Sequence, residues 1–214
     1  MEMRSRAGVV FLALVASCVI GCSTPAARSG ASGPSAPTAS APPDWRPGDR
    51  WTYEWTSGSE RGVKTAEVRE IRDVNGVSYY VVRLGEADHY YTRDLHWAAI
   101  ISESKVVARM QPPQPWFMWP LQPKRRWTGE GVFEHPKGTE RFSDTFMVVG
   151  TESVDVPAGH FEAVKLVRQT NKRDFDEYWY VPEVRWYVKW HGRRADADFD
   201  ESLQSYTFAP RLVP

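Results

Sequence analysis

Large aromatic and β-branched residues alternate with polar residues along most of this chain. Trp51, Tyr53 and Trp55 are separated by single Thr and Glu residues, and residues 184–190 repeat the pattern with Val and Trp. Because successive side chains of a strand point to opposite faces, a period of two predicts strands with one buried face. No long segment places apolar residues at helical spacing. We therefore expect an all-β fold.

Tight-turn signals separate these strands. Residues 74–77 contain Asn-Gly, which supplies the positive φ of a two-residue hairpin. Residues 156–159 place Pro and Gly where a type I turn takes them. Strands joined in this way predict an antiparallel curled sheet, either barrel-like or a sandwich. Residues 111–123 contain five prolines, so we predict a connection there and not a central strand.

Segments on the two sides of that connection resemble each other. The matched segments are 47–52 with 123–128, 88–91 with 176–179, and Trp97 with Trp186. Two related halves that share one core are one interpretation. Chance similarity in a chain with ten tryptophans is the other.

The N-terminus has the pattern of an export signal. Arg4 and Arg6 precede an apolar run over residues 7–20, which is shorter than the ~20 residues that a membrane-spanning helix needs. Residues 19–22, Val-Ile-Gly-Cys, resemble the lipobox of bacterial lipoproteins, in which the chain is cut before the cysteine and its thiol is acylated. We predict a signal peptide over residues 1–21 and a lipid on Cys22. Residues 15–18 resemble the same box, so Cys18 is the alternative.

The residues after Cys22 predict a tether and a location. Ser23 stands where lipoproteins retained at the inner membrane have Asp, so the resemblance implies the outer membrane. Residues 22–43 are nearly all Ala, Ser, Pro, Gly or Thr, which is typical of a flexible linker. Residues 44–214 have the length of a single domain. The predicted location is the cell envelope.

Composition excludes several functions for the domain. Both cysteines lie in the signal peptide and its lipobox, so the domain has none, and thiol catalysis and cysteine-bound zinc are excluded for it. Cleavage before Cys22 leaves 25 basic and 26 acidic residues, and such a chain lacks the basic footprint of a nucleic-acid binder. The five histidines have no metal-ligand spacing. Residues 196–201 alternate carboxylates as a calcium loop does, but Glu201 occupies the glycine position. We predict a solvated hairpin end there, and no metal or cofactor.

The tryptophans are predicted to lie mostly inside. Alternation places six of them on the inner face: Trp51, Trp55, Trp127, Trp179, Trp186 and Trp190. The same alternation predicts Asp174 and Asp176 on the solvent face. Trp116, Phe117 and Trp119 belong to the proline-rich connection instead. We predict that these three either plug one end of the sheet or form a surface for a ligand or partner.

Three segments together resemble the TapB-like and related uncharacterised β-domain lipoproteins of the bacterial envelope. The segments are 45–53, 156–165 with its Val-Pro-Ala-Gly hairpin, and 178–189 with its Tyr-Trp-Tyr strand. The chain departs from that pattern at Lys124 and Arg125, where the family often has Gly and an acid. The resemblance implies an antiparallel β fold and an envelope location, and it implies no catalytic residues.

These observations favour a non-catalytic, lipid-anchored envelope protein whose domain binds a protein, a glycan or an apolar ligand. A curled sheet lined with aromatic residues can hold an acyl chain, by analogy of fold. An inner cavity would favour this carrier function, and a solid core would favour surface recognition or a purely structural role. The alternative is a periplasmic hydrolase of glycan or peptide. Its candidate residues are Glu130, Glu134, Asp144 and Glu162.

Overall fold

The computed structural model describes residues 39–195 and 197–211, and every regular element in them is a strand. The strands are β1 (Arg50–Ser57), β2 (Glu60–Val74), β3 (Val77–Leu84), β4 (Ala87–Thr92), β5 (Trp97–Ser102), β6 (Lys105–Gln114), β7 (Arg126–His135), β8 (Gly138–Val156), β9 (Gly159–Thr170), β10 (Phe175–Val181), β11 (Trp186–Arg193) and β12 (Asp198–Thr207). The predicted signal peptide, with Cys18 and Cys22, lies outside the described residues, as does most of the predicted linker.

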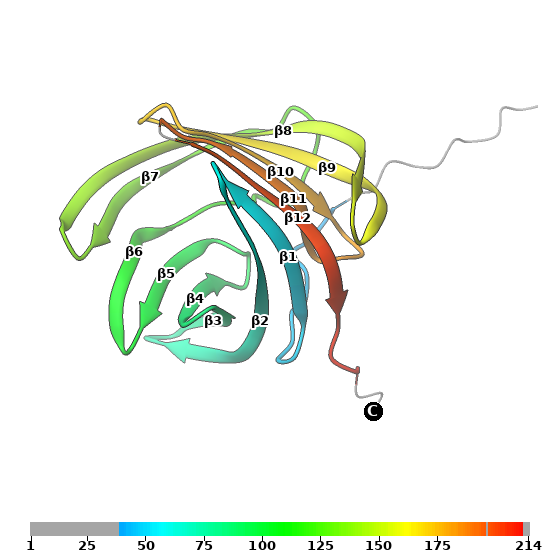
Figure 1. The fold of residues 1–214 in the computed structure, drawn as a ribbon. Helices are drawn as coiled ribbons and strands as arrows, with labels where there is room; N and C mark the ends of the chain where they lie inside the picture. Colours follow the sequence, from blue (N-terminus) through cyan, green and yellow to red (C-terminus); the bar gives the residue numbers. More distant parts are fainter. Residues whose placement is uncertain (1–38, 196, 212–214) are drawn as a thin grey trace, which may run out of the picture. The chain divides into compact units, whose positions relative to one another are not determined.

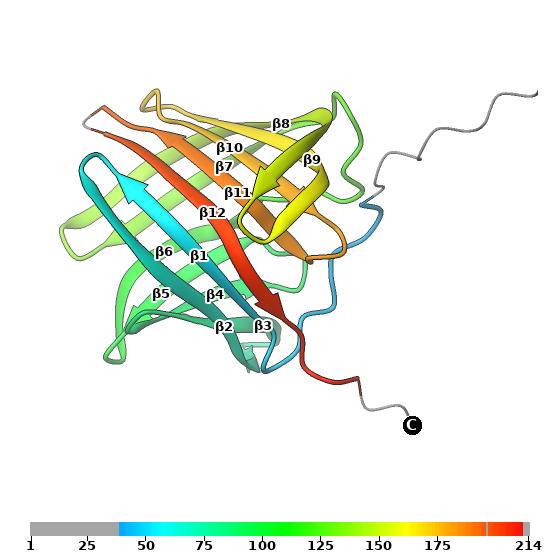
Figure 2. The ribbon, with the colours of Figure 1, turned by 45° about the vertical axis from the view of Figure 1, so that its right-hand side comes forward.

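The strands form one closed antiparallel barrel. Each strand pairs with the next along the chain, and β1 pairs with β12 to close the circle (Figures 1 and 2). This confirms the all-β, antiparallel prediction and decides for a barrel over a sandwich. Closure follows from the hydrogen-bonding needs of the first and last strands, because a sheet edge leaves backbone groups unpaired. Figure 2 shows β1 and β12 side by side at the front.

Both turns predicted from the sequence are present. Asn75 and Gly76 join β2 to β3 with φ values of 51° and 80°, the left-handed conformation that a two-residue type I′ hairpin requires. Pro157 and Ala158 join β8 to β9. Local turn chemistry therefore determines where these hairpins reverse.

The proline-rich stretch differs from the prediction at its start. Strand β6 continues to Gln114, so Pro112 and Pro113 lie inside a strand. They are tolerated because β6 pairs with β7 over only three positions, 109–111, so their missing N–H groups interrupt no ladder there. Gly131 of β7 leaves space for this approach, since a Cβ on it would lie 2.3 Å from the carbonyl oxygen of Gln111.

The two halves repeat a local geometry. The matched segments fall on β1 and β7, on β4 and β10, and at the starts of β5 and β11. Before β1, Gly48 has positive φ and donates to the carbonyl of Val68 (2.8 Å). Before β7, Lys124 also has positive φ and donates to the carbonyl of Val148 (2.7 Å). This shared geometry favours the interpretation of two related halves.

One end of the barrel is filled by the segment that precedes β1. The indole of Trp45 donates to the carbonyl of Arg185 (2.9 Å), and its ring packs on Trp51 of β1, whose indole donates to the carbonyl of Val184 (2.8 Å). Ala39 is buried and forms a bridge with the β6–β7 connection. The contacts of the barrel thus reach into the segment predicted as linker.

Trp179 is an exception to the predicted inner tryptophans. Its neighbour Tyr178 lines the interior, so Trp179 points to the opposite face of β10. There it lies between Lys165 and Lys189, whose ammonium nitrogens are 4.7 and 5.2 Å from its ring. These lysine stems cover it, which explains how an outward indole remains buried.

Candidate functional site

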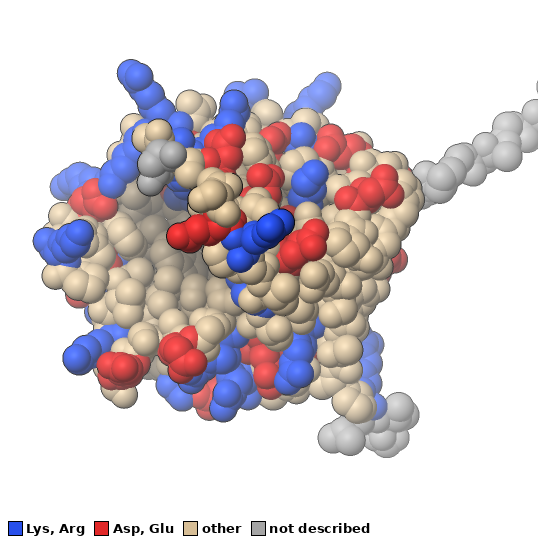
Figure 3. All heavy atoms as spheres, in the orientation of Figure 1, with Lys and Arg blue, Asp and Glu red and all other residues tan. Residues whose placement is uncertain are grey.

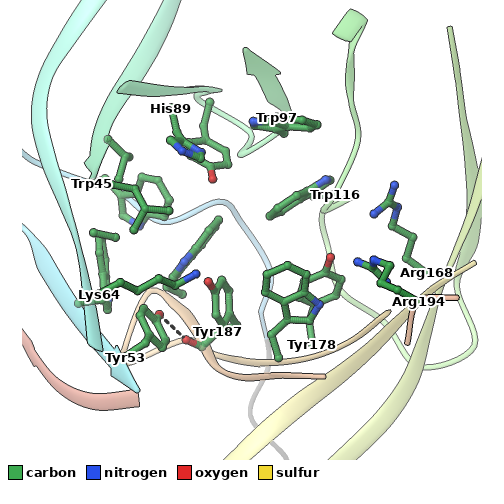
Figure 4. Close-up of a pocket in the computed structure, with 17 residues that line it drawn as sticks. Trp45, Tyr53, Lys64, His89, Trp97, Trp116, Arg168, Tyr178, Tyr187 and Arg194 are labelled. Carbon is green, nitrogen blue, oxygen red and sulfur yellow. Dashed lines mark hydrogen bonds between the residues drawn. The ribbon is translucent and has the colours of Figure 1, made fainter. Parts of the chain in front are cut away.

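The interior contains a cavity of about 270 Å³, called here the inner cavity (Figure 4). Thirteen of the seventeen residues that line it are aromatic or aliphatic. Six are tryptophans: Trp45, Trp51, Trp97, Trp116, Trp186 and Trp190. The core of the barrel is therefore not solid.

The alternation of the strands builds this wall. Trp51 and Tyr53 point inward from β1, as their spacing predicts. Trp186 packs edge-on against Trp45 and Tyr91, with ring centroids 4.6 and 5.5 Å apart. Trp116 reaches the same wall from the β6–β7 connection. These ring contacts hold the aromatic side chains of the wall in fixed positions.

A buried group of charges lies at one end of the inner cavity. Arg168 bridges Asp144 and Asp176 at 3.0 and 2.9 Å, and Arg194 also binds Asp176, at 2.6 Å. Asp176 receives a further hydrogen bond from the indole of Trp190 (2.9 Å). The prediction that Asp176 faces solvent is wrong, because two guanidinium groups and an indole satisfy its carboxylate inside the barrel.

The group of charges extends to the β6–β7 connection. Gln114 donates to Asp144, and the indole of Trp116 donates to Gln114 (2.5 Å). Burial raises the pKa of Asp144, while the charge of Arg168 acts in the opposite direction. The bonds position Trp116 relative to the charged end of the cavity.

A second buried ion pair stands on the other side of the inner cavity. Lys64 binds Glu201, which also accepts a hydrogen bond from the hydroxyl of Tyr187 (2.8 Å). Glu201 is fully buried, and burial raises its pKa. The prediction of a solvated hairpin end over residues 196–201 is therefore wrong for Glu201, since Lys64 and Tyr187 satisfy it inside.

His89 is the histidine of the inner cavity. Burial, with a contribution from the charge of Lys64, lowers the pKa of His89 to about 4, so this side chain is neutral at pH 7. In the part of the chain that the structure describes, no three His, Cys, Asp or Glu side chains gather closely enough to hold a metal ion.

A second cavity, of about 390 Å³ and called here the vestibule, adjoins the inner one. The two share Trp97, Arg168 and Arg194. Lys172, more than half exposed, lines the vestibule. Figure 3 shows a hollow in the face of the molecule that is turned toward the viewer, with uncharged residues on its wall and acidic and basic residues around its rim. The two arginines thus stand at the neck between the inner cavity and the vestibule.

The three aromatic residues predicted for a ligand or partner surface take different positions. Trp116 lines the inner cavity. Phe117 is buried, and it stacks on the half-buried Trp119 at 5.7 Å. A role for any of them in binding stays a prediction.

The sequence analysis missed the charged residues of the cavity. Arg168 occurs in phase with Val164 and Leu166, both of which are buried. Lys64 likewise stands two residues before buried Ala66. A basic residue in phase with an apolar strand face was the available signal.

The four carboxylates proposed for a hydrolase do not share a cleft. Glu130 and Glu162 are exposed and bind the serine hydroxyls of neighbouring strands. Glu134, two-fifths exposed, pairs with Arg109 at 3.4 Å. Asp144 alone points inward, where Arg168 holds it. These four carboxylates therefore do not form a pair of general acid and general base on the two sides of one substrate.

The fold and the cavities define a twelve-stranded antiparallel barrel with an aromatic interior. No protein-family model matches the chain, and no curated protein matches it. Among the described residues, no helix has the length and apolar character to span a membrane.

The solved structures that are similar to the chain include the following three. A proposed exported protein from Bacteroides fragilis with a YmcC-like fold is 13% identical, covers 79% of this chain and 99% of its own, and has a TM-score of 0.45. A proposed lipoprotein from Parabacteroides distasonis is also 13% identical, with the same coverage and a TM-score of 0.43. The hypothetical lipoprotein YmcC from Escherichia coli is 9% identical, covers 76% and 86%, and has a TM-score of 0.37.

Proposed function

We propose that this protein is a lipid-anchored envelope protein whose barrel binds an apolar small molecule and carries or stores it without chemical change. The observation that carries the proposal is the inner cavity with its aromatic wall. Ligand sites in proteins are concave and mostly apolar, with a few polar groups that orient the ligand. Lys64, His89, Arg168 and Arg194 are such groups.

The wall favours an apolar ligand over a sugar. Ligand pockets typically measure ~300–1,000 Å³, and the inner cavity and its vestibule, at about 270 and 390 Å³, together reach this range. A glycan would bring many hydroxyl groups against indole and aliphatic surfaces. Each hydroxyl left without a partner would cost about 1–3 kcal/mol.

Filling the inner cavity tests this proposal. Ala66 lines the cavity, and Ala66→Phe is expected to abolish binding of decanol to the mature protein because the new ring occupies the ligand space. Tryptophan fluorescence reports binding, since six indoles line the cavity. Native mass spectrometry of the protein purified from membranes shows whether an apolar molecule copurifies.

Ala99→Phe is the matched control, because Ala99 packs in a separate apolar cluster with Tyr90 and Val81. This variant is expected to bind decanol as the unaltered protein does. Failure of the unaltered protein to bind decanol, with no copurifying molecule, would contradict the carrier function. Equal loss in both variants would place the ligand elsewhere.

The anchor is proposed from the N-terminal sequence. Acylation of Cys22 attaches the protein to a membrane, Ser23 favours the outer membrane, and the part of the predicted linker that precedes Ala39 separates the barrel from the bilayer. The Ala/Pro/Ser composition of those residues supports a spacer.

Replacement of Cys22 by Ala is expected to move the protein from the membrane fraction to the soluble periplasmic fraction. The reason is that a thiol is required for the acyl attachment, and the apolar run of residues 7–20 is too short to span the bilayer. Fractionation and mass analysis of the lipid modification provide the measurement. Cys18→Ala is the matched control and keeps the anchor. Continued acylation of the Cys22→Ala variant would show that Cys18 carries the lipid.

A further inference from the structure

We infer that the ligand of the inner cavity carries an anionic head group, a carboxylate or phosphate, which Arg168, Arg194 and Tyr178 bind at the neck. This inference rests on the proposed function, because it names the chemical class of the ligand for the same cavity. The ligand is thus an anionic amphiphile whose apolar body lies among the indoles.

The first support is the direction of the charges. Lys64, Arg168 and Arg194 line the inner cavity, whereas no carboxylate is among the described residues that line it. Asp144 and Asp176 are almost fully buried and bind the two arginines outside the lining of the inner cavity. Asp144 lines the vestibule instead, with Glu140 and Asp174. The ion pairs therefore turn their positive ends toward the cavity, and a ligand inside meets donors rather than acceptors.

The arginines also retain donors for a ligand. A guanidinium group has five N–H donors. Arg168 directs one bond each from Nε, Nη1 and Nη2 to Asp144 and Asp176, and Arg194 uses Nη1 and Nη2 for Asp176 and nearby carbonyls. Each arginine thus has N–H groups beyond these bonds. Arginine donors match carboxylate and phosphate oxygens well.

An independent observation comes from Tyr178. Its hydroxyl is buried and makes no hydrogen bond of ordinary geometry in the described structure. Arg168 stands beside it but can only donate to it, so the hydroxyl proton has no acceptor. Figure 4 shows this hydroxyl on the side of the cavity where Arg168 and Arg194 lie. Buried polar groups rarely remain unpaired. An acceptor on a ligand at the neck would satisfy the hydroxyl and the spare guanidinium donors together.

Lys64 is the less suitable head-group site. Its ammonium group is bound to Glu201 and stands over the rings of Trp190 and Phe199, at 5.9 and 5.4 Å. The neck, in contrast, adjoins the vestibule. A head group there stays near water while the apolar body lies deeper, which is the favourable orientation for an amphiphile.

Paired probes test the inference on the mature protein. Decanoate and decanol share a chain and differ in the head group. The unaltered protein is expected to bind decanoate at least about tenfold tighter than decanol. Arg194→Gln is expected to lower the affinity for decanoate about tenfold and to change the affinity for decanol less than about twofold. Decyl phosphate distinguishes a phosphate preference from a carboxylate preference.

Two further variants make the result specific. Arg193→Gln alters the exposed neighbour of Arg194, which lies over the ring of Phe175, and it is expected to leave both affinities unchanged. Tyr178→Phe removes only the hydroxyl, and it is expected to lower the affinity for decanoate while the affinity for decanol stays unchanged. Circular dichroism confirms that each variant is folded.

The outcomes separate the two proposals. Decanol binding as tight as that of decanoate and decyl phosphate, or equal weakening of all probes by Arg194→Gln, would overturn the head-group inference while the carrier function stands. If neither decanol nor the anionic probes bind the unaltered protein, both proposals are wrong.

Discussion

Replacement of Arg168 by methionine is expected to lower the free energy of unfolding by about 3–5 kcal/mol, because it leaves two buried carboxylates without their shared cation. Asp144 and Asp176 have side-chain exposures of 1% and 0%, and Arg168 binds both. Methionine keeps the apolar stem and removes the charge. Urea unfolding followed by circular dichroism measures the change.

The pH dependence distinguishes this mechanism from simple loss of packing. Burial already raises the pKa of Asp144, and Arg168 opposes that rise. Without Arg168 the folded-state pKa rises further above the unfolded value. The folded variant then binds more protons than the unfolded chain, so its deficit in stability narrows as pH falls through the raised pKa. A deficit independent of pH would argue against an electrostatic origin.

The control for this variant is an arginine in an exposed pair. Arg50 binds Glu67 at 2.8 Å, with side-chain exposures of 51% and 33%. Arg50→Met is expected to lower the free energy of unfolding by no more than about 1 kcal/mol, because solvent screens exposed ion pairs. If the two variants lose equal free energy of unfolding, Arg168 does not stabilise the fold by pairing with buried carboxylates.

Replacement of Trp186 by alanine is expected to lower the free energy of unfolding by about 3–5 kcal/mol, since it removes a buried indole and leaves a void. Trp186 is 4% exposed and packs against Trp45, Tyr91 and Phe117. The same void adjoins the inner cavity, which Trp186 lines. The variant is therefore also expected to accept bulkier apolar probes than the unaltered protein does.

Urea unfolding measures the loss of stability, and fluorescence titration measures the change in ligand preference. Trp55 offers the control, because it is half-buried near the end of β1 and does not line the inner cavity. Trp55→Ala is expected to lower the free energy of unfolding by less than Trp186→Ala does, and to leave the preference among probes unchanged. A small loss for Trp186→Ala, or an unchanged preference for larger probes, would contradict the described packing around the cavity.

Much of the fold was predictable because its signals are local. Residues two apart in the sequence, such as Trp51 and Tyr53, determine the buried face of a strand. Two adjacent residues, such as Asn75 and Gly76, determine a hairpin turn. The site was only partly predictable. Aromatic residues were expected inside, and most of the named tryptophans are there, whereas Trp179 is covered on the outer face by two lysines.

The errors share one physical cause. Asp176 was predicted on the solvent face from the alternation of its strand, and Glu201 was predicted in a solvated hairpin end with the other carboxylates of residues 196–201. Their cations lie elsewhere in the sequence: Lys64 is 137 residues from Glu201, and Arg194 is 18 residues from Asp176. No local pattern records such pairs. The strand that carries each partner must first be brought across the barrel.

The sequence by itself determined that this chain makes antiparallel strands, where its tight turns fall, and that most of its tryptophans point inward. Only the tertiary structure decided that β1 meets β12 to close a barrel, that the core is hollow, and that cations line the hollow while their carboxylates lie outside its lining. The reason is the range of the interactions. Alternation and turn geometry depend on neighbouring residues, whereas closure, cavity and ion pairing depend on residues that become neighbours only when the chain has folded.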